Sequence, residues 1–131
     1  MKRVTAILIA MLWLTMPGSA WSKPRHWYSD PKFWMGEAVI AGALIADGAT
    51  TVNGLHRGMM ETNPILGAHP STARVAGYDV ALFAGYTAAN AAEQHVTRNE
   101  SKPWRVAGYV AIPAIAAGAH GYAAIHNSEL K

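Results

Sequence analysis

The residues of this chain that could do chemistry are a few acidic and imidazole side chains set inside long apolar segments. Asp47 lies in the first segment, Asp79 in the second and His120 in the third. Two carboxylates and one imidazole in a low-dielectric place could bind a divalent metal ion, share protons, or hold helices in register by hydrogen bonding. We predict a buried polar site at Asp47, Thr51, Asp79 and His120. Its expected role is mainly structural, with ion or proton binding as the alternative.

These three side chains are expected to meet because they lie at similar depths. Asp47 lies seven residues before the end of its segment, Asp79 five residues after the start of the next, and His120 six residues before the end of the third. At about 1.5 Å rise per residue, each lies roughly 8 to 10 Å inside one end of the molecule. An up-down-up arrangement of helices would therefore bring them together.

Three Ala- and Gly-rich apolar segments must position this site, at about residues 33–54, 74–95 and 104–126. Each is close to the twenty residues that a bilayer-spanning helix needs. We predict an all-α fold, a small transmembrane bundle of these helices within one domain, residues 21–131. Because acidic residues or histidine interrupt each segment, a soluble periplasmic bundle acting as a binding module is the alternative.

Small residues at four-residue spacing favour the membrane interpretation. Such stripes let helix backbones approach closely in lipid, where helix association depends on tight packing. Helix backbones can therefore approach closely along these stripes. The stripes are Ala81, Gly85 and Ala89; Ala84, Ala88 and Ala92; and the pairs Ala114 with Gly118 and Ala117 with Gly121.

The first twenty residues are typical of an export signal. Lys2 and Arg3 form a basic start, an apolar run follows from residue 4 to residue 15, and small residues end at Ala20. We predict cleavage after Ala20, with an uncleaved first helix as the alternative. The predicted location is the bacterial inner membrane, with the lipid bilayer, other membrane helices or further copies of the chain as partners.

Charge and cysteine content exclude several classes of protein. The formal net charge is +3, but removal of Lys2 and Arg3 with the signal leaves nine basic against eight acidic residues. This near balance argues against a nucleic-acid partner. The chain has no cysteine, which excludes disulfides, thiolate chemistry and Cys-ligated zinc.

Catalytic motifs are missing from the sequence. No H-E-x-x-H, no Gly-Lys-Ser/Thr phosphate loop and no serine in a nucleophile elbow occurs. We therefore predict a membrane protein with a structural or interaction role, no catalytic residue and no cofactor. A divalent metal at Asp47, Asp79 and His120 remains the exception to test.

A distinctive string joins the first two segments. It contains Asp47-x2-Thr50-Thr51 and then Glu61-Thr62-Asn63-Pro64. Here the chain resembles an uncharacterised family of small bacterial integral-membrane proteins, whose pattern is an Asp followed by Thr and Leu, a Gly, and Glu-x-Asn-Pro. The resemblance implies a membrane location and no particular chemistry. This chain departs from the pattern by placing Met59 and Met60 before Glu61.

The second half of this string has the residues of a capped turn. Asn63 can cap a short helical turn, Pro64 can occupy its first position, and Gly67 can end it. Glu61 is then expected at the mouth of the bundle. There its carboxylate would either face solvent as part of the loop or serve as an additional ligand in the polar site.

Overall fold

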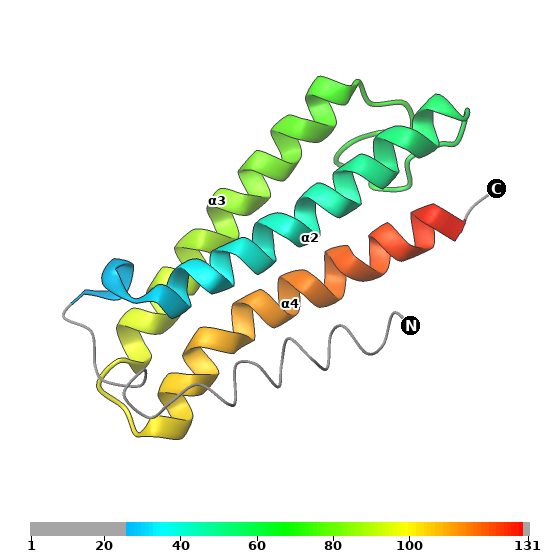
Figure 1. The fold of residues 1–131 in the computed structure, drawn as a ribbon. Coiled ribbons are helices and arrows are strands. Elements are labelled where there is room, and N and C mark those ends of the chain that lie inside the picture. Colours follow the sequence, from blue (N-terminus) through cyan, green and yellow to red (C-terminus); the bar gives the residue numbers. More distant parts are fainter. Residues whose placement is uncertain (1–25, 130–131) are drawn as a thin grey trace.

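The computed structural model describes residues 26–129 and contains three long helices. They are α2 (Pro31–His56), α3 (Thr72–Thr97) and α4 (Lys102–Glu129), and a single 3-10 turn, η2 (Trp27–Ser29), precedes them. Figure 1 shows them side by side as an up-down-up bundle, with α2 packed most extensively against α4. The all-α three-helix architecture predicted from the sequence is confirmed. The predicted signal, residues 1–20, lies outside the described residues.

Each helix extends a few residues beyond the predicted apolar segment because local caps set its ends. Asp30 caps α2 by accepting a hydrogen bond from the Lys32 amide at 2.9 Å, and Pro31 follows at the first helical position. Ser71 caps α3 by accepting from the Arg74 amide at 3.2 Å. The polar flanks of the apolar segments therefore belong to the helices.

Among the described residues, close helix contacts occur at glycines that lie outside the small-residue stripes noted in the sequence. A Cβ built on Gly85, Gly118 or Gly121 would meet no described side chain or neighbouring helix within 4 Å. A Cβ built on Gly36 would lie 2.9 Å from Pro113 Cγ, and one on Gly108 would overlap with the Thr97 side chain. Spacing alone did not identify the inward face, since alanine and glycine also occupy the outward faces of these helices.

The interior of the bundle is unusually polar for its size. Its largest buried apolar cluster consists of Ile40, Leu44 and Ala116, which are 0, 2 and 0 % exposed. We call these three residues the apolar layer. Polar and charged side chains are buried as deeply elsewhere in the described chain: Asp30, Lys32, Glu37, Asn90 and Gln94.

Candidate functional site: a polar chamber at one end of the bundle

His120 lies on α4 and contacts side chains of both α2 and α3 at one level of the bundle. Since a carboxylate accepts hydrogen bonds, the His120 Nδ1–H donates to Asp47 Oδ2 on α2 at 2.8 Å. The neutral imidazole can then accept from the Tyr86 hydroxyl on α3, which lies 3.3 Å from Nε2. Both ring nitrogens therefore have protein partners, and the hydrogen on Nδ1 is fixed by Asp47.

Asn127, two helical turns after His120, adds a second connection between α4 and α2. Its side-chain amide donates to Thr51 Oγ1 at 3.0 Å and, more weakly, to Asp47 Oδ1 at 3.4 Å. Thr50 instead donates to backbone carbonyls of its own helix. Of the two threonines in the sequence motif, Thr51 thus belongs to the site.

Asp79 lies beside this pair but is not hydrogen-bonded to any described residue. A Cβ built on Gly48 of α2 would overlap with Asp79 Oδ2, so the carboxylate lies directly against the backbone of α2. Asp79 is partly exposed and lines the same cavity as Asp47 and His120. The structure brings all three predicted residues to one place, with Asp79 left free.

A cavity of about 290 Å³ opens beside these side chains. We call it the chamber. Its walls come from the C-terminal halves of α2 and α4 and the N-terminal part of α3, and Glu61 and Asn63 of the α2–α3 loop line its mouth. Since a water molecule occupies about 30 Å³ in the liquid, several waters fit. No lysine or arginine of the described chain lines the chamber.

The loop motif holds the shape that its residues predict. Asn63 Oδ1 accepts from the Ile65 amide at 3.0 Å and so caps the turn that begins at Pro64. Gly67 ends this turn with a left-handed φ of +78°. Glu61 Oε1 accepts from the Asn63 amide at 2.8 Å, which places this carboxylate in the loop at the mouth of the chamber.

The described residues do not form a preorganised metal site. Among residues 26–129, no group of three His, Asp or Glu side chains is arranged to hold one. The reason is visible at His120, whose two nitrogens already face Asp47 and Tyr86. A metal would have to displace one of these hydrogen bonds before it could gain an imidazole ligand.

A second polar cluster lies deeper in the bundle and was missed as a unit by the sequence analysis. The Glu37 carboxylate on α2 accepts from the Thr87 hydroxyl and, at 2.8 Å, from the Asn90 amide on α3. The Gln94 amide donates to Asn90 Oδ1 at 3.1 Å. We call these four residues the closed network. Thr87, Asn90 and Gln94 recur at helical spacing, which was the available signal.

The apolar layer separates the chamber from the closed network. Ile40 and Leu44 follow Glu37 and precede Asp47 along α2, and Ala116 faces them from α4. Tyr86 packs against this layer while its hydroxyl reaches His120. The chamber therefore has an apolar floor.

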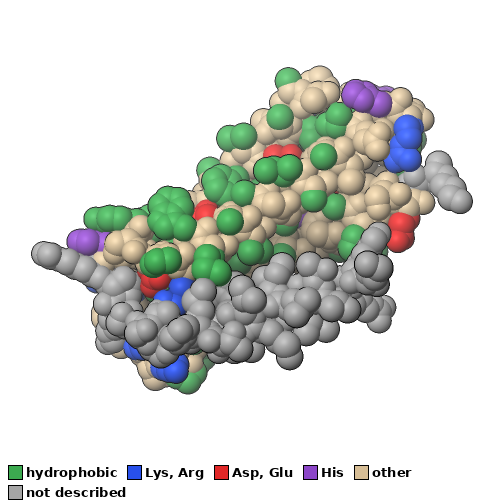
Figure 2. All heavy atoms as spheres, viewed as in Figure 1, with side chains coloured by type: hydrophobic (Ala, Val, Ile, Leu, Met, Phe, Trp, Pro, Cys, Tyr) green, Lys and Arg blue, Asp and Glu red, His purple; other side chains and the backbone are tan. Residues whose placement is uncertain are grey.

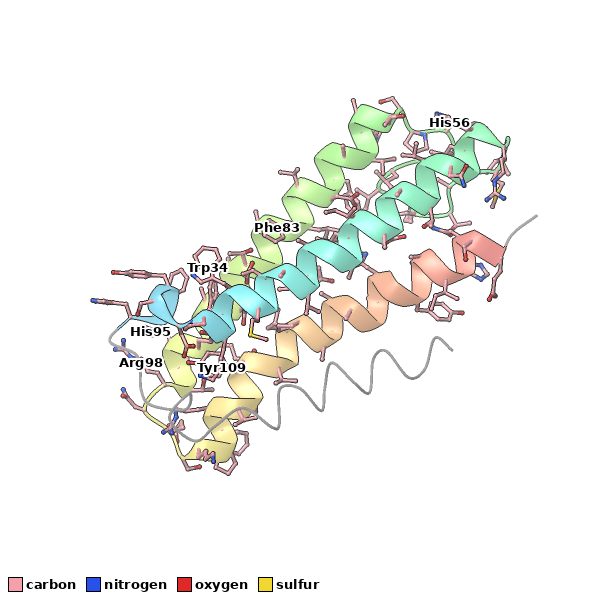
Figure 3. The ribbon with its side chains drawn as sticks, viewed as in Figure 1. Trp34, His56, Phe83, His95, Arg98 and Tyr109 are labelled. Atoms are coloured by element: carbon pink, nitrogen blue, oxygen red, sulfur yellow. The ribbon has the colours of Figure 1, made fainter. Side chains whose placement is uncertain are left out.

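The opposite end of the bundle carries aromatic and basic side chains. In Figure 3, Trp34, His95, Arg98 and Tyr109 lie at this end, His56 lies at the other, and Phe83 lies between them. The Tyr109 hydroxyl donates to Asp30, whose other oxygen lies 3.5 Å from Lys32 Nζ. Polar contacts thus tie η2 and the start of α2 to α4.

Comparison of the chain with protein-family models, with curated proteins and with solved structures found no match. The resemblance to a family of small membrane proteins therefore remains a prediction.

Proposed function

We propose that this chain is a small multi-pass membrane protein whose helical bundle has a structural or interaction role and no catalytic centre. The observation that carries the proposal is where charge lies along the helices. Within residues 33–55, 75–94 and 106–125, every Asp, Glu and His side chain is buried or partly buried, and no Lys or Arg occurs. Those residues are Glu37, Asp47, Asp79, Glu93 and His120.

Large apolar side chains occupy the outward faces of the same segments. Ile45 and Ile115, near the middle of α2 and α4, are 70 and 58 % exposed, and Val80, in the first half of α3, is 69 % exposed. Figure 2 shows hydrophobic side chains spread along the visible face, with basic side chains gathered toward its ends. Polar groups inside and apolar groups outside are what lipid favours.

Helix length supports the same proposal. The helices have 26, 26 and 28 residues. At about 1.5 Å per residue, each is longer than the roughly 30 Å hydrocarbon core. Among the described residues, α2 and α4 are long and apolar enough to cross a membrane by length and composition. Helix α3 has the more polar sequence, and its place in the membrane rests on packing against the other two.

A charge placed on the outward face tests the proposal. Lysine at Ile115, near the middle of α4, should cost about 2.5 to 3.5 kcal/mol of membrane insertion. In a water-soluble bundle, the same change at an exposed position should alter stability by no more than about 0.5 kcal/mol. We therefore expect Ile115→Lys to reduce the amount of protein that resists alkaline extraction from membranes.

Ile125→Lys is the matched control, because Ile125 is 44 % exposed near the end of the same helix. A lysine there can reach the headgroup region. Equal extraction of both variants and the wild type into the aqueous phase would overturn the membrane proposal in favour of a soluble bundle.

Proton binding in the chamber is a second candidate function. It is favoured by one specific observation: Asp47, Asp79 and His120 line the same cavity, which has room for several water molecules. Thermal unfolding of the detergent-extracted protein between about pH 5 and pH 8 tests it. We expect a pH response that is reduced in Asp47→Asn and His120→Gln. An unchanged response in both variants would leave the chamber a structural feature.

A further inference from the structure

We propose that the chamber is a dead-end compartment, so that the Asp47–His120 pair exchanges protons with one side of the membrane only and does not conduct them across it. This inference rests on the proposed membrane location. It deepens the second candidate function by assigning the side from which the site is reached. The α2–α3 loop marks that side.

The side toward the loop is open because polar groups continue from His120 to the mouth of the chamber. Thr51, Asn127 and Asn63 line this route, together with Glu61. The chamber has room for several water molecules along it. Water can therefore carry protons between bulk solvent and His120.

The opposite route is closed because the apolar layer offers protons no hydrogen-bonding group. Ile40 and Ala116 have no exposed surface, and Leu44 is 2 % exposed. Leu82, Tyr86 and Ile112 pack around them. Beyond the layer, the Glu37 carboxylate is held by Thr87 and Asn90 and is itself 4 % exposed. The two polar regions are thus neighbours without a shared water-filled path.

The titratable groups around His120 come from every surrounding element. Asp47 faces it from α2, Asp79 and Tyr86 from α3, and His126 lies one or two turns further along α4. Glu61 faces the chamber from the loop, and Tyr78 of α3 and Tyr122 of α4 also line it. All of them except Tyr86, whose hydroxyl points to His120, lie on the loop side of the apolar layer. Each can therefore equilibrate with the same solvent.

The absence of cysteine from the sequence makes a direct test available, since any introduced thiol is unique. Thr51→Cys places one in the chamber and Ala116→Cys places one in the apolar layer. Thr62→Cys in the loop and Asn99→Cys in the turn between α3 and α4 report the two ends. A membrane-impermeant thiol reagent is added to sealed vesicles of right-side-out and inside-out orientation.

We expect Thr51→Cys to react in the vesicles in which Thr62→Cys reacts, and not in those in which Asn99→Cys reacts. Ala116→Cys should react at least about tenfold more slowly from either side, because it lies in a dry, fully packed place. Reaction of Thr51→Cys from the Asn99 side, or equal rates at Thr51 and Ala116, would overturn the dead-end assignment. Reaction of Thr62→Cys and Asn99→Cys from the same side would instead show that the membrane proposal fails.

Proton flux in liposomes provides an independent readout. Wild-type protein should dissipate an imposed pH gradient no faster than empty liposomes. Leu44→Asn should increase the leak several-fold by adding a polar group to the layer, and Ala116→Ser is the milder variant in case Leu44→Asn does not fold. Conduction by the wild-type protein would overturn the proposal.

Discussion

The closed network and the chamber use the same kinds of side chain, yet they differ in access to solvent. Glu37 and Asn90 are 4 and 0 % exposed, and the carboxylate accepts two neutral hydrogen bonds. Asp47 and His120 are 18 and 14 % exposed in their side chains and adjoin a cavity. A buried polar group without a partner is costly, whereas a group facing water can change partner or protonation state. Burial thus makes one cluster structural and leaves the other able to respond.

The largest effect is expected when the closed network loses a partner. Asn90→Ala removes the hydrogen bond to a buried carboxylate and leaves a cavity beside it, which should destabilise the bundle by about 2 to 4 kcal/mol. Thermal unfolding in detergent measures this. The control is Asn99→Ala, an exposed asparagine just beyond α3, for which a change within about 0.5 kcal/mol is expected. Equal losses of stability in Asn90→Ala and Asn99→Ala would mean that the closed network does not stabilise the bundle.

Replacing a glycine by alanine should change stability less, and in opposite directions beside the closed network and beside the chamber. A Cβ at Gly36 would meet Pro113 Cγ at 2.9 Å and Asn90 Nδ2 at 3.4 Å. Neither group can move away easily, because Pro113 is part of α4 and Asn90 belongs to the closed network. Gly36→Ala should therefore cost about 1 to 3 kcal/mol through overpacking. A Cβ at Gly48 would displace the Asp79 carboxylate, which can rotate into the chamber.

Gly48→Ala should be nearly neutral or stabilising by up to about 1 kcal/mol, because alanine is the better helix former. The same unfolding measurement compares the two variants. A loss at Gly48 as large as that at Gly36 would show that Asp79 is as tightly held as the closed network.

The smallest effects are expected at the two aspartates of the chamber, and they should oppose each other. Asp47→Asn weakens the contact with His120 and should cost about 1 kcal/mol at neutral pH. Asp79→Asn removes a like charge that has no described hydrogen-bond partner and should raise stability by up to about 0.5 kcal/mol. The unfolding free energies of both single variants and of the double variant give the interaction energy between Asp47 and Asp79. A loss in Asp79→Asn would show that this carboxylate has a stabilising partner.

The lengths of the apolar segments, and the distances of Asp47, Asp79 and His120 from the segment ends, were enough to predict the three helices and the level at which these residues meet. They were enough because up-down-up connectivity fixes which helix ends lie together, and because polar residues of apolar helices turn inward. The turn at Asn63, Pro64 and Gly67 also follows from local chemistry. The conformation of this turn depends only on residues that are close in sequence.

Which side chains of different helices contact one another depends on how each helix is rotated about its axis. The sequence alone did not give these rotations. The close approaches at Gly36, Gly48 and Gly108 could not be told from the open positions at Gly85 and Gly118, because both sets are glycines in Ala-rich helices. The partnership of Glu37 with Thr87 and Asn90 required knowledge of which faces of α2 and α3 meet.

The sequence by itself determined an all-α bundle of three long helices, its capped loop and the level at which Asp47, Asp79 and His120 meet, since these follow from segment length, local capping residues and connectivity. Only the tertiary structure decided that Asp79 stays free while Asp47 holds His120, and that an apolar layer divides two polar regions. The physical reason is that these properties arise from how three helices are rotated and packed against one another, which sets burial and solvent access for each side chain.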